Sequence, residues 1–465
     1  MRATALVPEV VVLGAALALL LAGRKLPARD RNWLAGAALV AAAAALALEL
    51  WLGAAVGTLF DGGWQQDRFA LFAKAALLLA LIVLIATTMS STTEPEARDP
   101  LPAVFVVVFG GMVAASATSL LGLWAGLEVA ALAAVAVSGL SSREAGVRLL
   151  VLSAVGGALF AVGLAVLFAT TGDASLAALR TALGPTSVNL ALALAVLLTL
   201  TGIAIRLGLA PFQWLSVEGG LSVSAIGAGT LGGLLVGVAA IVAAKLLGGL
   251  GTVIVAWAPW LAVLSATAML LGGLRAATAA SPRAVAAWLV VAQVGWVAAG
   301  LAAHDRRGSA AALLVLGALL LAASAAPALA RVDVGTPLAT LRRAQPLRAL
   351  GLALLMLSLA GAPPLAGFIG QFAVAAELVR SNLTWLLTVG LLGSLLSVVA
   401  AVRVIRLLYL ESVPDQPRPA RGVRSPAQTW SAEALTPAVL VLLYSLLANP
   451  ISGLALQGAA ALKLP

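Results

Sequence analysis

Long apolar runs alternate with short polar segments along almost the whole chain. A transmembrane helix needs about 20 predominantly apolar residues. Fourteen runs approach or exceed that length: 4–23, 34–56, 69–90, 101–118, 120–140, 148–170, 188–211, 222–246, 252–273, 284–302, 309–330, 347–379, 383–409 and 434–456. No stretch has the apolar–polar alternation of a barrel strand. The pattern therefore predicts an all-α polytopic membrane protein with about 14 transmembrane helices.

Two of these runs are interrupted by proline and glycine. The seventh ends in "RLGLAPFQWL" (206–215), which contains Pro211, and the twelfth contains "GAPPLAGFIG" (361–370), with Pro363 and Pro364. Proline in a membrane helix frees backbone carbonyls, which neighbouring groups or water must then satisfy. Paired breaks in corresponding helices of two halves are typical of inverted-repeat transporters. Ordinary proline kinks are the alternative interpretation.

The spacing of the two breaks predicts how the chain is divided. They lie five predicted helices apart, and an odd offset gives the two broken helices opposite orientations in the membrane. We therefore expect three N-terminal transmembrane helices (1–100), a first five-helix repeat (101–250), a second, inverted five-helix repeat (251–410), a polar loop (411–433) and a C-terminal transmembrane helix (434–465).

The composition agrees with a protein surrounded by lipid. Hydrophobic residues make up 62% of the chain and charged residues 10%, whereas soluble domains carry about 25% charge. The absence of cysteine excludes disulfides and thiolate metal sites, and the single histidine, His304, excludes a His-rich metal site. We expect no catalytic residue, metal or cofactor in this chain.

The net charge of +10 could suggest a nucleic-acid partner, but the basic residues are distributed like a topology signal. Of the 28 lysines and arginines, 18 lie in loops that follow odd-numbered predicted helices and 8 on the side of the termini. Because cytoplasmic loops are enriched in basic residues, we expect 411–433 in the cytoplasm and both termini outside it. The first run carries Glu9 and lacks a small-residue cleavage site, so we expect a retained helix rather than a signal peptide.

Charged residues inside the predicted spans are candidates for function because charge is costly in a bilayer. Glu128 is the only charged residue in 101–142, and Arg206 is the only one in 181–217. Glu128 lies in the middle of its span, so we expect a buried ion pair with Arg206. Arg148 is a second possible partner.

Other charged residues lie closer to the ends of their spans. Lys245 and Glu377 are candidates for a proton path, but at span ends such side chains can also reach the interface. The same interfacial interpretation applies to Glu9 and Glu49, and Lys74 lies in the third span.

Several segments, among them the two interrupted ones with "RLGLAPFQWL" (206–215) and "GAPPLAGFIG" (361–370), resemble the antiporter-like membrane subunits of respiratory complex I (NADH-quinone oxidoreductase). "LSLAGAPPLAGFIGQF" (357–372) resembles the family's "LSLxGxPPLAGFxGKF", and "GIAIRLGLAPFQWL" (202–215) resembles "GxxFKxxxAPFHxW". "GLEVAAL" (126–132) is similar to the fifth-helix glutamate motif, and "SPRAVAAWLVVAQVGWVAAGL" (281–301) to "NxKRLLAYSSIAHxGYxxxG". The "PE" in "LVPEVVV" (6–12) and the short length favour subunit N. Cation/proton antiporter and membrane-bound hydrogenase subunits share several of these motifs.

The resemblance implies a subunit of a proton-translocating NADH:quinone oxidoreductase without a redox centre. It also implies a bacterial inner membrane location and other membrane subunits as partners. In the family, protons are thought to move through buried glutamates and lysines along the membrane midplane.

This sequence departs from the family at the titratable positions. Arg206 occupies the seventh-helix lysine position, Gln293 the tenth-helix histidine position and Gln371 the twelfth-helix lysine position. No lysine occurs near Gly233–Leu235, where the eighth-helix lysine falls. Arginine effectively never deprotonates and glutamine does not titrate.

Two functions therefore remain open from the sequence. The chain is either a transport subunit that keeps Glu128 as its titratable site, or a structural subunit that seals the membrane and binds its neighbours. An independent solute carrier is a weaker third interpretation, because nothing in the sequence suggests a substrate pocket.

Overall fold

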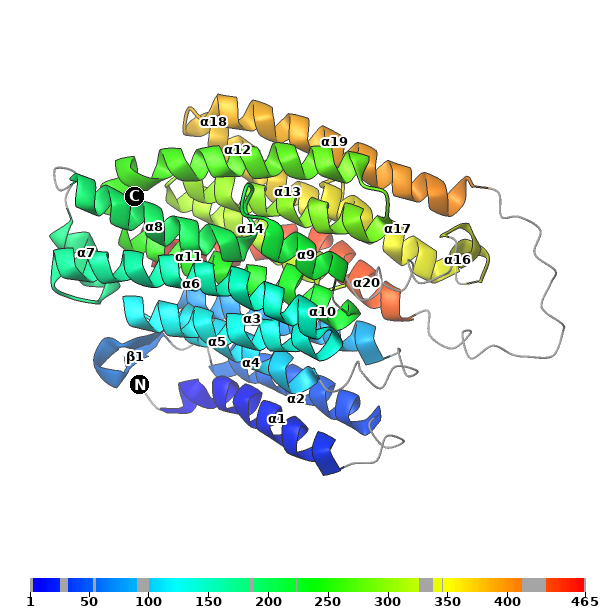
Figure 1. Ribbon diagram of the computed structural model, residues 1–465, viewed down its shortest axis with the longest axis horizontal. Helices are drawn as coiled ribbons and strands as arrows, with labels where there is room; N and C mark the ends of the chain where they lie inside the picture. Colours follow the sequence, from blue (N-terminus) through cyan, green and yellow to red (C-terminus); the bar gives the residue numbers. More distant parts are fainter. Residues whose placement is uncertain are drawn as a thin grey trace.

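The computed structural model describes residues 3–25, 32–52, 56–89, 100–183, 188–222, 224–325, 338–344, 346–411 and 432–463. Most of the predicted loop at 411–433 therefore lies outside the described residues. The helices run side by side along the long axis of the molecule (Figure 1). The N-terminus, the C-terminus and strand β1 lie at the same end of this bundle.

The N-terminal part forms one edge of the bundle. It consists of η1 (Ala3–Leu6), α1 (Val7–Lys25), α2 (Asn32–Leu52), β1 (Gly57–Leu59), η3 (Phe60–Gly62), β2 (Trp64–Gln66) and α3 (Arg68–Met89). The strands form an antiparallel hairpin in which Gly57 pairs with Gln66. This hairpin, which the hydrophobic pattern did not predict, covers the ends of the surrounding helices.

The next segment corresponds to the first predicted repeat. It contains α4 (Leu101–Ser116), α5 (Leu120–Ser141), α6 (Arg143–Thr171), α7 (Leu176–Ala182), α8 (Leu190–Leu207), α9 (Trp214–Ser222), α10 (Ala225–Gly229), the π-helical turn η6 (Thr230–Leu235) and α11 (Val236–Gly249). The short helix α7 reaches across the end of the bundle. Its Arg180 donates from Nε to Gly248 O (2.7 Å) and from Nη2 to Leu462 O (3.0 Å).

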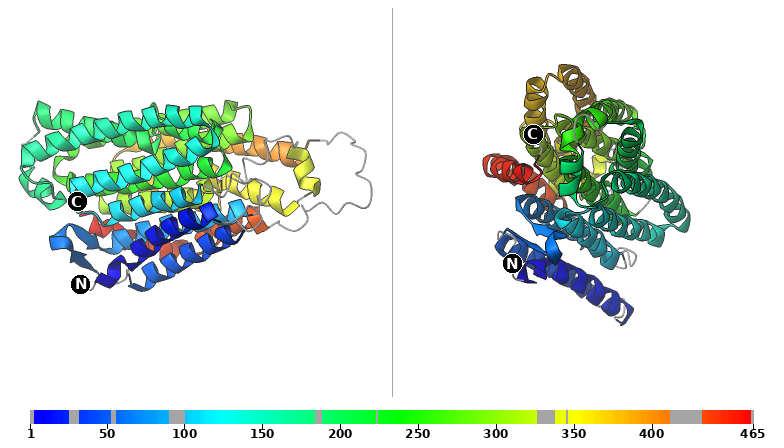
Figure 2. Two further views of the ribbon diagram at one scale, coloured as in Figure 1. Left: turned by 60° about the horizontal axis from the view of Figure 1, so that its bottom comes forward. Right: turned by 90° about the vertical axis from the view of Figure 1, so that its left-hand side faces the viewer.

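The following segment corresponds to the second predicted repeat. It contains η7 (Gly251–Val253), α12 (Ile254–Thr278), α13 (Pro282–Ala302), α14 (Arg306–Ala323), α16 (Leu338–Ala344), α17 (Pro346–Ala360), α18 (Ala366–Arg380) and α19 (Thr384–Tyr409). Figure 1 and the right-hand view of Figure 2 place α1 and α2 on one side of the molecule and α18 and α19 on the opposite side. Helices α13 and α14 are almost wholly buried between them.

The C-terminal segment differs from the single helix expected over 434–465. It forms α20 (Ala432–Leu446) and α21 (Ala448–Ala461), which are bent by 79° relative to each other. Pro450 explains the division, because proline is tolerated in the first turn of a helix but breaks a helix interior. Helix α21 packs against α3 and α14.

The chain is a helical, polytopic membrane protein. Within the described ranges, eleven helices are long and apolar enough to cross a membrane, or twelve if α20 and α21 count as one span. The apolar helices α4 and α17 are shorter. Large apolar side chains such as Trp33 and Val255 are each 79% exposed on the outside of the bundle, as expected for a surface that faces lipid.

Candidate functional site

Helix α8 breaks where the sequence predicted. It ends at Leu207, and Gly208 adopts a left-handed conformation with φ of 70°. Pro211 follows in the connection to α9, after a cis Ala210–Pro211 bond. A residue with a Cβ atom adopts this positive φ only at a cost, which accounts for glycine at position 208.

The second break has the same local design. Helix α17 ends at Ala360, and Gly361 has φ of 76°. Pro363 and Pro364, joined by a cis bond, precede α18. In both places, a glycine with positive φ ends the helix three residues before a proline (Gly208 and Pro211, Gly361 and Pro364).

An ion pair lies at the first break. Arg206, in the last turn of α8, donates from Nη2 to both carboxylate oxygens of Glu128 on α5, at 2.8 Å each. The guanidinium also donates to Leu127 O (3.2 Å) and Ser153 O (3.1 Å). The side chain of Arg206 is wholly buried, and that of Glu128 is 19% exposed. The ion pair predicted from the sequence is therefore present.

The backbone of α6 closes over this pair. A Cβ atom on Gly157 would lie 2.5 Å from Glu128 Oε1 and 2.6 Å from Arg206 Nη2. A side chain at position 157 would displace the two charged groups, and glycine allows the close approach of α6. The alternative partner, Arg148, does not contact Glu128. It pairs instead with Glu144 (3.1 Å) and Glu218 (3.5 Å) near the surface.

Uncharged groups line the second break. Gln293, on α13, donates from Nε2 to Leu359 O (2.9 Å) at the end of α17. The last carbonyls of a helix lack intrahelical partners, so this amide satisfies a carbonyl that the break leaves free. Gln293 Oε1 and Ser358 Oγ are buried and have no hydrogen-bond partner among the described residues.

A short hydrogen-bond chain reaches Gln371 on α18. Trp296 Nε1 donates to Ser394 Oγ (3.0 Å), and Ser394 Oγ donates to Gln371 Oε1 (3.2 Å). The Gln371 amide packs against Gly361, where an added Cβ atom would overlap it. The two sequence candidates Gln293 and Gln371 therefore lie at the same break.

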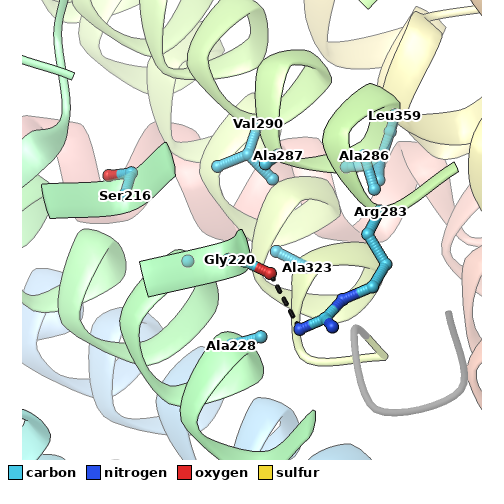
Figure 3. A pocket seen from close by; sticks show the side chains of 10 residues that line it. Ser216, Gly220, Ala228, Arg283, Ala286, Ala287, Val290, Ala323 and Leu359 are labelled. Carbon is cyan, nitrogen blue, oxygen red and sulfur yellow. Dashed lines mark hydrogen bonds between the residues drawn. The ribbon is translucent and has the colours of Figure 1, made fainter. Parts of the chain in front are cut away.

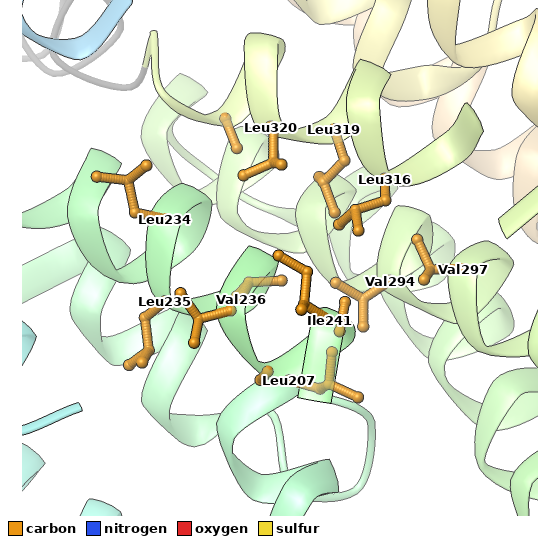
Figure 4. Close-up of a cluster of buried hydrophobic side chains, with 14 of the residues drawn as sticks. Leu207, Leu234, Leu235, Val236, Ile241, Val294, Val297, Leu316, Leu319 and Leu320 are labelled. Carbon is orange, nitrogen blue, oxygen red and sulfur yellow. The ribbon is translucent and has the colours of Figure 1, made fainter. Parts of the chain in front are cut away.

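The region between the two breaks is filled by aliphatic side chains. Figure 4 shows a cluster that extends from Leu207, next to Arg206, to Val294, next to Gln293. Leu234 and Leu235, both in the π-helical turn η6, belong to this cluster. The resemblance places the eighth-helix lysine of the family near Gly233–Leu235. The charged site and the amide site are separated by apolar packing.

A small cavity lies near the two breaks and is lined by residues from both predicted repeats. Its volume is about 40 Å³, and residues from α9, α13 and the end of α17 line it, among them Ser216, Ala287 and Leu359 (Figure 3). By volume it holds about two or three water molecules. Arg283 Nη2 donates to Gly220 O (3.2 Å) at its edge, and Ser216 Oγ has no hydrogen-bond partner among the described residues.

The remaining two sequence candidates lie apart from both breaks. Lys245, on α11, donates from Nζ to Ala115 O (2.7 Å) at the end of α4, where the helix dipole favours a cation. Glu377, in the last turn of α18, pairs with Arg380 at 2.5 Å. Neither residue contacts the Glu128–Arg206 pair or the two amides.

Three residues of this region were not singled out from the sequence: Gly157, Trp296 and Ser394. A search for charge in apolar runs overlooks neutral groups. Tryptophan and serine within apolar runs are the signal that could have identified the chain to Gln371. Among the described residues, no group of three or more histidine, aspartate or glutamate side chains is arranged to hold a metal ion.

The fold and site define a polytopic membrane protein with two broken helices, an ion pair at one break and amides at the other. The chain belongs to the family described as NADH:quinone oxidoreductase/Mrp antiporter, whose transmembrane model matches residues 117–397.

Curated relatives carry consistent names. The NADH-quinone oxidoreductase subunit N of Chloroflexus aggregans is 30% identical over 404 residues, which cover 80% of each chain. That of Trichlorobacter lovleyi is 29% identical over 428 residues and 87% of each chain.

Two solved structures share the fold. A chain of respiratory complex I from Thermus thermophilus, solved with bound aureothin, has a TM-score of 0.77 and 24% identity, with 96% of this chain and 98% of that one covered. A chain of the Mrp complex from Dietzia sp. has a TM-score of 0.82 and 21% identity, with 100% and 98% covered.

Proposed function

We propose that this chain is a subunit N-like component of the membrane arm of an NADH:quinone oxidoreductase. It contributes to proton translocation without a redox centre of its own. The names of the curated relatives and the family support this function. The partners are other membrane subunits of the same complex, and the location is the bacterial inner membrane.

The proposal includes fourteen spans in the arrangement expected from the sequence. Adding α4, the broken helix α17–α18 and the bent pair α20–α21 to the eleven long helices gives that number. The matching breaks support two inverted repeats, 101–250 and 251–410, after the three helices in 1–100. The excess of basic residues supports termini outside the cytoplasm.

The observation that carries the function is the Glu128–Arg206 pair. Because the guanidinium effectively never deprotonates, Glu128 is the partner that can change its charge. Proton uptake by Glu128 would release the contacts of Arg206 Nη2 with the carboxylate, while those with Leu127 O and Ser153 O persist. The pair can thus couple proton uptake to a local rearrangement at the first break.

Proton pumping by the reconstituted complex tests this role. Glu128→Gln keeps the size of the side chain and removes its titration, so we expect at least a several-fold lower proton-to-electron ratio in a complex that still assembles. Glu144→Gln, at an exposed ion pair, is the control and should behave like the wild type. An unchanged ratio in Glu128→Gln would contradict the transport role.

A structural subunit is the second candidate, favoured by the apolar cluster between the breaks and by the uncharged second site. Gln371→Leu removes the acceptor for Ser394 and tests this alternative. If the chain is structural, this change lowers assembly and leaves pumping by the assembled complex intact. Loss of pumping with normal assembly and electron transfer would exclude the structural function.

A further inference from the structure

A second group of buried charged residues lies in the N-terminal part, away from both breaks. Lys74, on α3, forms an ion pair with Glu9 on α1. Lys74 Nζ also donates to Gln66 Oε1 (2.7 Å), and Gln66 Nε2 donates to Glu49 Oε1 on α2 (2.7 Å). Glu49, Gln66 and Lys74 are inaccessible to solvent, and Glu9 is 4% exposed.

The hairpin encloses this group at the end of the bundle that holds the N-terminus. The ring centroid of Trp64, in β2, lies 4.7 Å from Lys74 Nζ. Trp64 is itself buried and bridges to Ala117 after α4. The group therefore forms an enclosed interior site. This corrects the interpretation that Glu9 and Glu49 reach the membrane interface.

The charges within the site do not balance. Two carboxyl groups face one ammonium group, and both Glu9 Oε2 and Glu49 Oε2 are buried without a hydrogen-bond partner among the described residues. Glu9 has the direct ion pair, whereas Glu49 reaches Lys74 only through the neutral amide of Gln66. A buried carboxylate without a cation is strongly disfavoured.

Among the described residues, no second cation pairs with Glu49. The other charged residues on the neighbouring described elements include Asp61 in η3, Asp67 and Arg68 at the start of α3, Lys245 on α11 and Arg306 at the start of α14. Lys245 is directed to Ala115 O and lies over Phe69, and Arg306 donates to Leu456 O. Arg68 lines a separate apolar cavity with Tyr444. Helices α4 and α21 contain no charged residue.

We propose that Glu9, Glu49, Gln66 and Lys74 form a proton-binding site, with one exchangeable proton held on Glu49. Addition of the proton neutralises the excess carboxylate, and its loss leaves Glu49 as an anion that Gln66 and Lys74 stabilise at a distance. The site is a property of the N-terminal helices and does not rest on the proposed function.

A polar cavity provides a place for proton exchange with water. It has a volume of about 200 Å³, lies at the same end of the bundle and is lined by Gln65, Asp67, Arg180 and Lys245. Gln65 and Asp67 flank Gln66 in the chain, so the cavity adjoins the short backbone segment that carries Gln66.

Infrared difference spectroscopy of the intact complex tests the proposal. On exchange from H2O to D2O, the wild type should show a carboxylic acid C=O band from a buried group, and Glu49→Gln should lose it. Lys74→Met removes the cation, so Glu9 should take up a proton as well and the band should grow about two-fold.

Three further variants make the result decisive. Glu144→Gln changes an exposed carboxylate, and Glu128→Gln changes a buried one that is paired with its own arginine; both should retain the band. Glu49→Asp keeps an acid and should show the band at a shifted frequency, which serves if Glu49→Gln does not assemble. A wild type without the band, or a band that Glu49→Gln and Glu49→Asp leave unchanged, would overturn the proposal.

Discussion

At the scale of single residues, the Glu128–Arg206 pair shows how an arginine changes the role expected from a lysine. Two oxygens of one carboxylate meet Nη2 of the guanidinium at 2.8 Å; the same nitrogen also donates to Ser153 O, and Nη1 donates to Leu127 O. The planar guanidinium has its donors in fixed directions, so it rearranges less readily than the ammonium group of a lysine. Under the proposed transport function, a change of charge at this site therefore has to come from the carboxylate.

Gly157→Ala tests how tightly this pair is enclosed. The added methyl group would meet both charged groups, so we expect a loss of about 1–3 kcal/mol, typical of overpacking, and weaker proton pumping. The measurement is the thermal stability of the purified complex. Gly14→Ala, in α1 with open space around its Cβ position, is the control and should be neutral or slightly stabilising. Equal stability of the two variants would contradict the enclosure of the pair.

The pair could be predicted from sequence because each partner is the only charge in its span. The contacts of the two amides could not. Gln293 and Gln371 stood out only by the resemblance, and nothing in the sequence indicates that Gln293 donates to Leu359 O or that Gln371 accepts from Ser394. Such contacts depend on how α13, α17, α18 and α19 pack together.

At the scale of elements, the two breaks were predictable and their geometry was not. Proline and glycine signal an interruption, but the left-handed conformation of Gly208 and Gly361 is a property of the folded turn. The bend between α20 and α21 was missed because hydropathy is continuous across it. The β1–β2 hairpin was missed because each strand has only three residues.

Comparing Gly361→Ala with Gly172→Ala separates the cost of backbone conformation from the cost of packing at the second break. A positive φ alone costs an alanine about 1–2 kcal/mol, and here the methyl group would also overlap the Gln371 amide. Gly172→Ala is the matched control, since Gly172 has φ of 73° with open space around its Cβ position. We expect Gly361→Ala to lower the free energy of unfolding at least about 1 kcal/mol more than Gly172→Ala, measured by chemical denaturation in detergent. Equal losses would mean that Gln371 does not pack against the break.

At the scale of the whole molecule, orientation in the membrane is the property that the distribution of charge predicts. Because the chain has no native cysteine, single cysteines report on it directly. Ala420→Cys, in the predicted cytoplasmic loop, should react with an impermeant maleimide only from the cytoplasmic side. Phe60→Cys, which replaces a 73% exposed residue of the hairpin region, should react only from the opposite side. Labelling of position 420 from outside the cell alone would reverse the proposed topology.

The contacts of Arg180 also bear on the order in which the molecule is completed. This side chain joins α7 to Gly248 and to Leu462 at the end of α21, and Leu462 follows Arg180 by 282 positions. During synthesis, α7 is made long before its second partner leaves the ribosome. The end of the bundle that holds the hairpin and the polar cavity can therefore be completed only after α21 has been synthesised. The contacts within the first half can form before this end is complete.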